Sequence, residues 1–134
     1  MNEQLLFDEL KTVVPDLARA EHKMSRWDCR SDCSRLLIEL KCRRTHYPTL
    51  LLEKKKYDAM LSKAEELGYE PLYINSTPKG IYVFNLKDLD IEFKVEHKHP
   101  ATTAFGNRSR VAKEVGYLCI ETQGYKFDNE IKKD

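Results

Sequence analysis

The sequence of 134 residues predicts an α/β fold in which a mixed central β-sheet is flanked by helices. Three observations support this. Apolar residues repeat at helical spacing in 3–14 and 50–67, two strand-like runs surround a short turn within 26–43, and further strand-like runs occupy 69–75 and 81–86. Hydrophobic residues form 41% and charged residues 34% of the chain, which is typical of a globular domain.

Residues 3–14 form the first predicted helix, with acidic residues early, where they favour a helix start. Pro15 ends or kinks this helix because its ring removes a backbone donor. Residues 16–21 then form a further turn that leads into the first strand. The apolar stripe of this helix consists of Leu5, Leu6, Leu10, Val13 and Val14.

A β-hairpin is expected next, with Ser31, Asp32, Cys33 and Ser34 as its turn. Successive side chains of a strand point to opposite faces. In the second strand, one face therefore carries Leu36, Ile38, Leu40 and Cys42, and the other carries Leu37, Glu39, Lys41 and Arg43. Charges on a mostly apolar strand are costly unless they are paired or used. This conflict indicates a functional site.

The pattern Asp28-x10-Glu39-x-Lys41 within residues 26–44 resembles the core motif of the PD-(D/E)XK nuclease superfamily, which has the restriction-endonuclease-like fold. The proline that precedes the aspartate in that family is replaced by Trp27. The resemblance implies an αβββαβ core and Mg²⁺- or Mn²⁺-dependent hydrolysis of phosphodiester bonds. It also implies that Asp28, Glu39 and the Leu40 carbonyl hold the metal and that Lys41 lies near the attacking water.

The motif does not identify every metal ligand. Asp32 could replace Asp28 as the first ligand, although its place in the expected turn favours Asp28. Many members of the superfamily add a glutamate from the first helix, and the candidate here is Glu21, which is equally well explained as a solvated residue. Glu3 or Glu9 could take the same role.

The second half of the core follows the hairpin. Thr49 is expected to cap a helix over 50–67, with an apolar stripe formed by Tyr57, Met60, Leu61, Ala64 and Leu67, and Gly68 suits its C-terminal end. Residues 76–80 form the turn between the strands at 69–75 and 81–86.

Beyond this core, 87–99 is expected to form an edge strand or an extended arm, followed by a polar loop over 100–107. A short basic helix is expected over 108–115, stopped by Gly116, and a last strand over 117–121. We expect a single domain over residues 1–134, with 125–134 as a flexible tail.

The net charge of +1 excludes a strongly basic coat protein but not a nucleic-acid partner, because the distribution of charge matters more than its sum. Arg43 and Arg44 adjoin the proposed site and could grip neighbouring phosphates. Arg108 and Arg110, with Thr102 and Thr103, form a second candidate DNA-contacting segment, although a plain surface loop is the simpler explanation. The lysine run 54–56 is interpreted as a solvated face.

Histidine and cysteine patterns do not indicate a zinc site. His97 and His99 share a strand face but lack a third ligand, and the spacing of Cys29, Cys33 and Cys42 matches no zinc pattern. We expect Cys29, Cys42 and Cys119 to be small buried residues.

The resemblance implies a DNA nuclease, endo- or exonucleolytic, acting on branched or single-stranded DNA. The alternative is an inactive nucleic-acid-binding or interaction module on the same fold. A homodimer is expected, because cutting a duplex needs two subunits or sequential nicks. The chain has no apolar run that could span a bilayer and no basic leader, so we expect a cytoplasmic protein, or one of the host cytoplasm if it is viral. Phage-encoded proteins include chains of this size and type.

Overall fold

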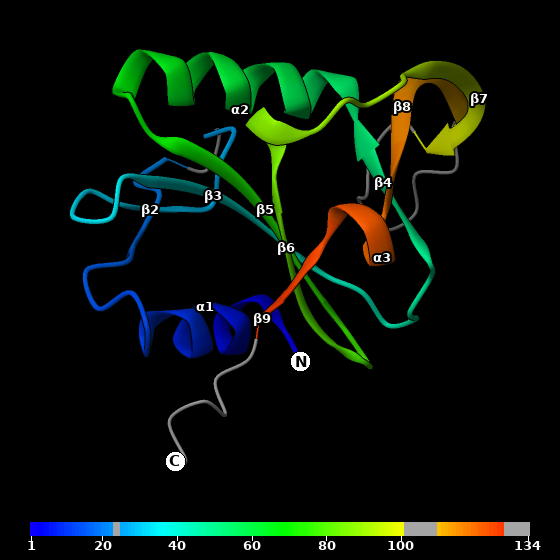
Figure 1. Cartoon of the computed structure of the whole chain (residues 1–134). Coiled ribbons are helices and arrows are strands. Elements are labelled where there is room, and N and C mark those ends of the chain that lie inside the picture. The colour runs from blue at the N-terminus through cyan, green and yellow to red at the C-terminus, as the bar shows by residue number, and fades with distance from the viewer. Residues whose placement is uncertain (23–24, 101–109, 128–134) are drawn as a thin grey trace.

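The computed structural model describes residues 1–22, 25–100 and 110–127. In chain order its elements are α1 (Glu3–Lys11), β1 (Ala18–Arg19), β2 (Cys29–Ser31), β3 (Leu36–Cys42), β4 (Thr49–Glu53), α2 (Lys54–Leu67), β5 (Glu70–Thr77), β6 (Gly80–Asn85), the 3₁₀ turn η1 (Leu86–Asp88), β7 (Lys94–Pro100), β8 (Arg110–Cys119), α3 (Ile120–Gln123) and β9 (Tyr125–Phe127) (Figure 1).

Within these described ranges the strands form two sheets. The larger has the order β1-β2-β3-β5-β6-β9, and the smaller has the order β4-β8-β7. In the larger sheet β3 and β5 run parallel, whereas the other neighbouring pairs are antiparallel. Because parallel neighbours need a crossover, β4 and α2 lie between β3 and β5 in the sequence. The predicted mixed sheet flanked by helices is confirmed.

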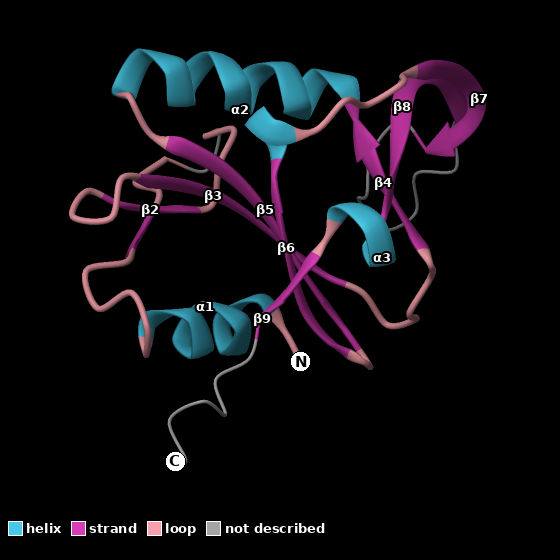
Figure 2. Ribbon diagram, viewed as in Figure 1, coloured by secondary structure: helices cyan, strands magenta, loops and turns pink. Residues whose placement is uncertain are grey.

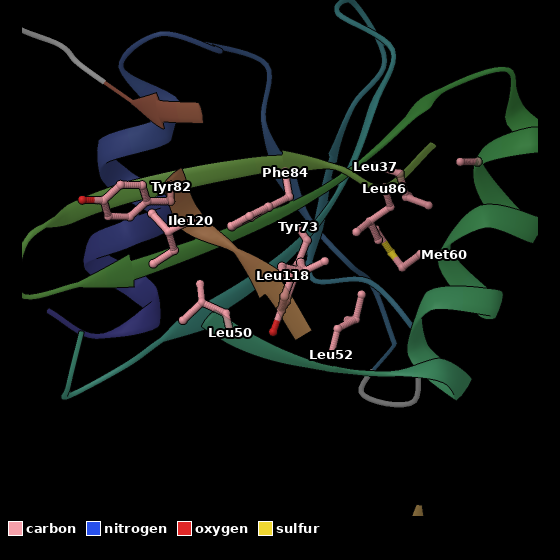
Figure 3. Close-up of a cluster of buried hydrophobic side chains, with 11 residues drawn as sticks. Leu37, Leu50, Leu52, Met60, Tyr73, Tyr82, Phe84, Leu86, Leu118 and Ile120 are labelled. Carbon is pink, nitrogen blue, oxygen red and sulfur yellow. The ribbon is translucent and has the colours of Figure 1, made fainter. Parts of the chain in front are cut away.

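The larger sheet lies between the two main helices, α1 on one face and α2 on the other (Figure 2). The alternation expected for β3 is present: Ile38 and Leu40 pack with Leu6, Leu10 and other residues on the α1 side. On the other face, Leu37 belongs to a cluster that includes Met60 of α2, Phe84 of β6 and Leu50 and Leu52 of β4 (Figure 3). Cys29 is fully buried, as expected, whereas Cys42 and Cys119 are only half-buried.

The start of α2 differs from the sequence prediction. Thr49 does not cap a helix, because residues Thr49–Glu53 form β4 and pair with β8. The run of three leucines at 50–52 fits a helix or a strand equally well by periodicity, and pairing with a strand distant in the sequence decides between them. The helix begins only at Lys54. Its predicted end is confirmed, because Gly68 adopts a left-handed conformation with φ 74°.

The basic helix expected over 108–115 is wrong. Residues Arg110–Cys119 form β8, and Gly116 lies inside this strand instead of stopping a helix. A Cβ atom on Gly116 would lie 2.5 Å from Cγ2 of Ile91, so the absence of a side chain permits the packing of the preceding segment on the strand.

Smaller differences concern element ends. The first helix ends at Lys11, before Val13, and the last strand gives way to α3 at Ile120. The expected strand over 87–99 divides into η1 and β7. Tyr125–Phe127, expected in the tail, form β9 and pair with β6. Arg108, Thr102 and Thr103 lie outside the described residues, as do the side chains of His99 and Arg110. No helix among the described residues is long and apolar enough to cross a membrane.

Candidate active site

The β2–β3 hairpin brings Asp28 and Glu39 together. Its register pairs Cys29 with Ile38, and the backbone N–H of Asp28 donates to the Ile38 carbonyl at 2.8 Å. Asp28 thus lies immediately before β2, opposite the middle of β3. Oδ2 of Asp28 accepts from the backbone N–H of Leu40 at 2.7 Å, which fixes the orientation of the carboxylate.

The Leu40 carbonyl faces the same edge. β2 begins at Cys29, so no strand in the described ranges pairs with β3 on that side beyond Ile38, and the Leu40 N–H donates to the Asp28 carboxylate instead. Within a strand the N–H and C=O of one residue point to the same neighbour. The open edge of β3 therefore presents the carbonyl of Leu40 beside the side chain of Asp28.

Glu39 is buried, with 6% of its surface exposed. Its pKa is raised from 4.5 to about 7, first by burial and then by the charge of Asp28, while Lys56 acts in the opposite direction. A buried acid whose pKa is raised by burial and by a neighbouring carboxylate is typical of functional sites.

Lys56 is the residue of the candidate site that the sequence analysis missed. Its Nζ donates to Oε2 of Glu39 at 2.5 Å, from the first turns of α2. Burial lowers the pKa of Lys56, but the charge and hydrogen bond of Glu39 outweigh it, so this pKa ends above its ordinary value. The sequence did contain a signal for this position. Lys56 lies four residues before Met60 and eight before Ala64, the buried residues of α2, and residues at this spacing share one face of a helix. The lysine run is therefore not wholly a solvated face.

Lys41 lies on the same face of β3 as Glu39 and is exposed. It makes no hydrogen bond or ion pair with another described residue, so its ammonium group is available to a ligand. The structure therefore brings Asp28 and Glu39 together. Lys41 lies two residues beyond Glu39, on the same face of β3.

Arg43 is already engaged within the protein. Its Nε donates to Oδ1 of Asn75 at 2.8 Å, and its Nη2 donates to the Leu51 carbonyl at 3.0 Å and to the Tyr73 hydroxyl at 2.9 Å. The guanidinium therefore joins β3, β5 and β4. Arg44, by contrast, is exposed and makes no hydrogen bond or ion pair with a described residue.

The alternative acids lie elsewhere. Asp32, in the hairpin turn, accepts hydrogen bonds from the Tyr69 hydroxyl and from Arg30, and these lower its pKa. Glu21 is exposed and lines a surface depression with Asp32, and Glu3 forms an ion pair with Arg19 at 3.0 Å. Glu9 of α1 is half-buried and is not among the groups that shift the pKa of Glu39. The geometry thus favours Asp28 as the partner of Glu39.

The donor set suits Mg²⁺ or Mn²⁺. Two carboxylates and a backbone carbonyl are hard oxygen ligands, and Mg²⁺ is commonly held by only one or two carboxylates with water completing its shell. No group of three histidine, cysteine, aspartate or glutamate side chains that could hold a metal occurs in the described part of the chain. A divalent cation here would also relieve the mutual repulsion of Asp28 and Glu39.

Replacing Lys56 by Met should destabilise the protein in a pH-dependent way. Without the ammonium group, ionised Glu39 is buried beside Asp28 with no cation, so we expect the free energy of unfolding at pH 8 to fall by roughly 1–3 kcal/mol. At pH 5, where Glu39 is protonated, the loss should be small. Urea denaturation at both pH values measures this, and the double variant Lys56→Met/Glu39→Gln should recover the stability lost at pH 8. An equal loss at both pH values would contradict it.

The comparison with known proteins is informative at the level of structure. No known family and no curated protein matches the sequence. The structure is similar to that of Hjc, a Holliday junction resolvase from the archaeal hyperthermophile Archaeoglobus fulgidus, with a TM-score of 0.57, 13% identity, and 94% of this chain and 93% of that chain covered. Hjc belongs to the PD-(D/E)XK nuclease superfamily. The chain therefore has the restriction-endonuclease-like fold that residues 26–44 predicted.

Proposed function

We propose that the protein is a metal-dependent nuclease that hydrolyses phosphodiester bonds in DNA. The observation that carries this proposal is the pairing of Asp28 with buried Glu39 at the open edge of β3, with the unpaired Lys41 next along the same face. The similarity of fold to a Holliday junction resolvase supports it.

In this proposal Asp28, Glu39 and the Leu40 carbonyl hold Mg²⁺ or Mn²⁺. The bound ion would neutralise charge on the scissile phosphate and lower the pKa of a coordinated water. Lys41 orients the attacking water and stabilises the charge that develops on the phosphate. Lys56 keeps Glu39 in place and offsets part of its charge before the metal and the substrate arrive.

Branched DNA is the substrate that the fold similarity favours, because the similar structure is that of a junction resolvase. A compact chain that carries one such site would cut both strands of a duplex as a homodimer. We therefore propose endonucleolytic cleavage of junctions or of single strands near branches, with Arg44 contacting adjacent phosphates. Arg110, at the start of β8, remains a candidate for the same role.

The proposal predicts that the purified protein cleaves DNA in Mg²⁺ or Mn²⁺ and not in EDTA. The substrates are a labelled junction, the matching duplex and single strand, a closed circular plasmid, and an RNA strand of the same sequence. Cleavage of the plasmid identifies an endonuclease, since an exonuclease needs an end. The variant Asp28→Asn/Glu39→Gln is the control for contaminating nucleases. Equal cleavage by the variant and the wild type would remove the support for this function.

The second candidate is a nucleic-acid-binding module without catalysis. It is favoured by the short contact between Lys56 and Glu39, since the buried carboxylate already has a cation. Calorimetric titration with Mn²⁺ separates the two candidates. The nuclease should bind the ion and lose that binding in Glu39→Gln, whereas the binding module should show no heat above background with either protein.

A further inference from the structure

Two segments beside the site carry positive charge and no acidic residue. The sequence from residue 40 to residue 52, which includes the connection from β3 to β4, contains Lys41, Arg43 and Arg44 but no aspartate or glutamate. The stretch 71–86, which includes the turn from β5 to β6, likewise contains Lys79 and no acid. The net charge of the whole chain is only +1, so the positive charge of these two segments is a local feature beside the site.

The register of the sheet brings these segments together. Lys41 pairs with Asn75, Asn75 with Tyr82, and Tyr82 with Lys126, so these four residues form one row across β3, β5, β6 and β9. Paired residues of neighbouring strands share a face of the sheet, which places Lys41 and Lys126 on the face that also carries Glu39.

The β3–β4 connection lies against the β5–β6 turn (Figure 1). Nδ1 of His46 and Oγ1 of Thr77 are 2.8 Å apart, and the His46 ring lies 5.6 Å from the Tyr82 ring. The side chain of Lys126 passes over Gly80, where a Cβ atom would lie 2.9 Å from its Cε. Lys79 is the neighbouring residue in the same turn and is exposed.

These cations have no acidic partner among the residues that the structure describes. Lys41, Arg44, Lys79 and Lys126, which we call the basic rim, are all exposed, and none forms an ion pair with a carboxylate in the described ranges. Lysines elsewhere on the surface do pair with acids, as Lys54 does with Asp58 and Lys87 with Glu70. An unneutralised group of exposed cations next to a carboxylate site is suited to a polyanion.

We propose that the basic rim binds the sugar–phosphate backbone of the nucleic-acid strand on one side of the scissile phosphate. Three strand spacings of about 4.8 Å separate Lys41 from Lys126, or roughly 14 Å. One strand of a double helix advances about 3.4 Å along the helix axis per nucleotide, so a duplex whose axis follows this row would present roughly four nucleotides to the rim. The rim contacts phosphates and not bases, so its binding is independent of sequence. The direction of the strand relative to cleavage rests on the proposed function, whereas the backbone contact itself does not.

The test is the variant Lys79→Ser/Lys126→Ser, which spares Lys41 and every residue of the site. Its affinity for a fluorescein-labelled junction, duplex and single strand is measured by anisotropy in EDTA over a series of salt concentrations. We expect binding to weaken roughly ten- to fifty-fold for all sequences, and the slope of log affinity against log salt to decrease by about 1.4 to 1.8. The matched control is Lys87→Ser/Lys94→Ser, which removes the same charge from other exposed positions and should leave both quantities unchanged.

The outcomes separate the two proposals. If the wild type cleaves DNA and the rim variant binds DNA with unchanged affinity and slope, the proposed role of the basic rim is wrong and the proposed nuclease function is retained. If the wild type cleaves no DNA, and the rim variant loses affinity for DNA while the control variant does not, the role of the rim is retained and the nuclease function is wrong. An equal loss in the rim and control variants would show that only net charge matters and would overturn the rim. Binding of the wild type to phosphatidylserine vesicles but to no oligonucleotide would overturn it as well.

Discussion

Lys41→Ala is expected to reduce metal-dependent cleavage about 10³-fold or more while leaving the protein folded. The ammonium group of Lys41 is exposed and unpaired in the described structure, so its removal breaks no internal contact. A group that positions a proton or stabilises developing charge typically contributes about 10²- to 10⁴-fold to the rate. Single-turnover cleavage of a labelled junction in saturating Mn²⁺ measures the loss.

Two controls make this result specific. Lys55→Ala removes a neighbouring exposed lysine of α2 that contacts neither acid, and it should cleave at the wild-type rate. The melting temperature of Lys41→Ala should match that of the wild type. Its affinity for DNA in EDTA should fall by no more than about eightfold, which is the contribution of one phosphate contact. Undiminished cleavage by Lys41→Ala would rule out its catalytic role.

The hairpin could be predicted because its signals are local. Strand alternation fixed the faces of β3, and turn-forming residues separated it from β2, so that Asp28 had to lie across from the middle of β3. The same alternation placed Glu39 and Lys41 on one face. The sequence predicted only a mixed sheet. The structure shows that β3 and β5 are its parallel pair, and the helix between the two strands provides the crossover.

The small sheet could not be predicted because its signals are distant. Leu50 and Leu52 are buried in the core, and their strand pairs with β8, about 65 residues away in the sequence, so nothing local distinguishes them from helix residues. The mixed charges of β8 likewise hid a strand, which is stabilised by neighbours on both sides. Lys56 was missed for a different reason: its charge was taken as a sign of exposure, whereas its helical position placed it on the buried face of α2.

Glu39→Gln should make the protein more stable above neutral pH. The pKa of Glu39 is about 7 in the folded state and about 4.5 when unfolded, so the folded state binds more protons between these values. The free energy of unfolding of the wild type therefore falls as the pH rises from about 4.5 to about 7, by at most about 3 kcal/mol. Glutamine cannot ionise, so the variant should gain up to that amount at pH 8 and match the wild type near pH 4. Urea denaturation across this range measures the difference.

The same substitution should abolish metal binding and cleavage, because a neutral amide replaces one of the two carboxylates that face the open edge of β3. Asp32→Asn is the matched control: it removes one acidic charge from the same hairpin, at the alternative ligand position, and should retain Mn²⁺ affinity and activity. If Glu39 served only to stabilise the fold through its ion pair, its removal should destabilise the protein. A variant that is more stable at high pH but does not bind Mn²⁺ therefore argues for a role of Glu39 in metal binding. Retained Mn²⁺ affinity in Glu39→Gln, or its loss in Asp32→Asn, would transfer the metal site to the hairpin turn.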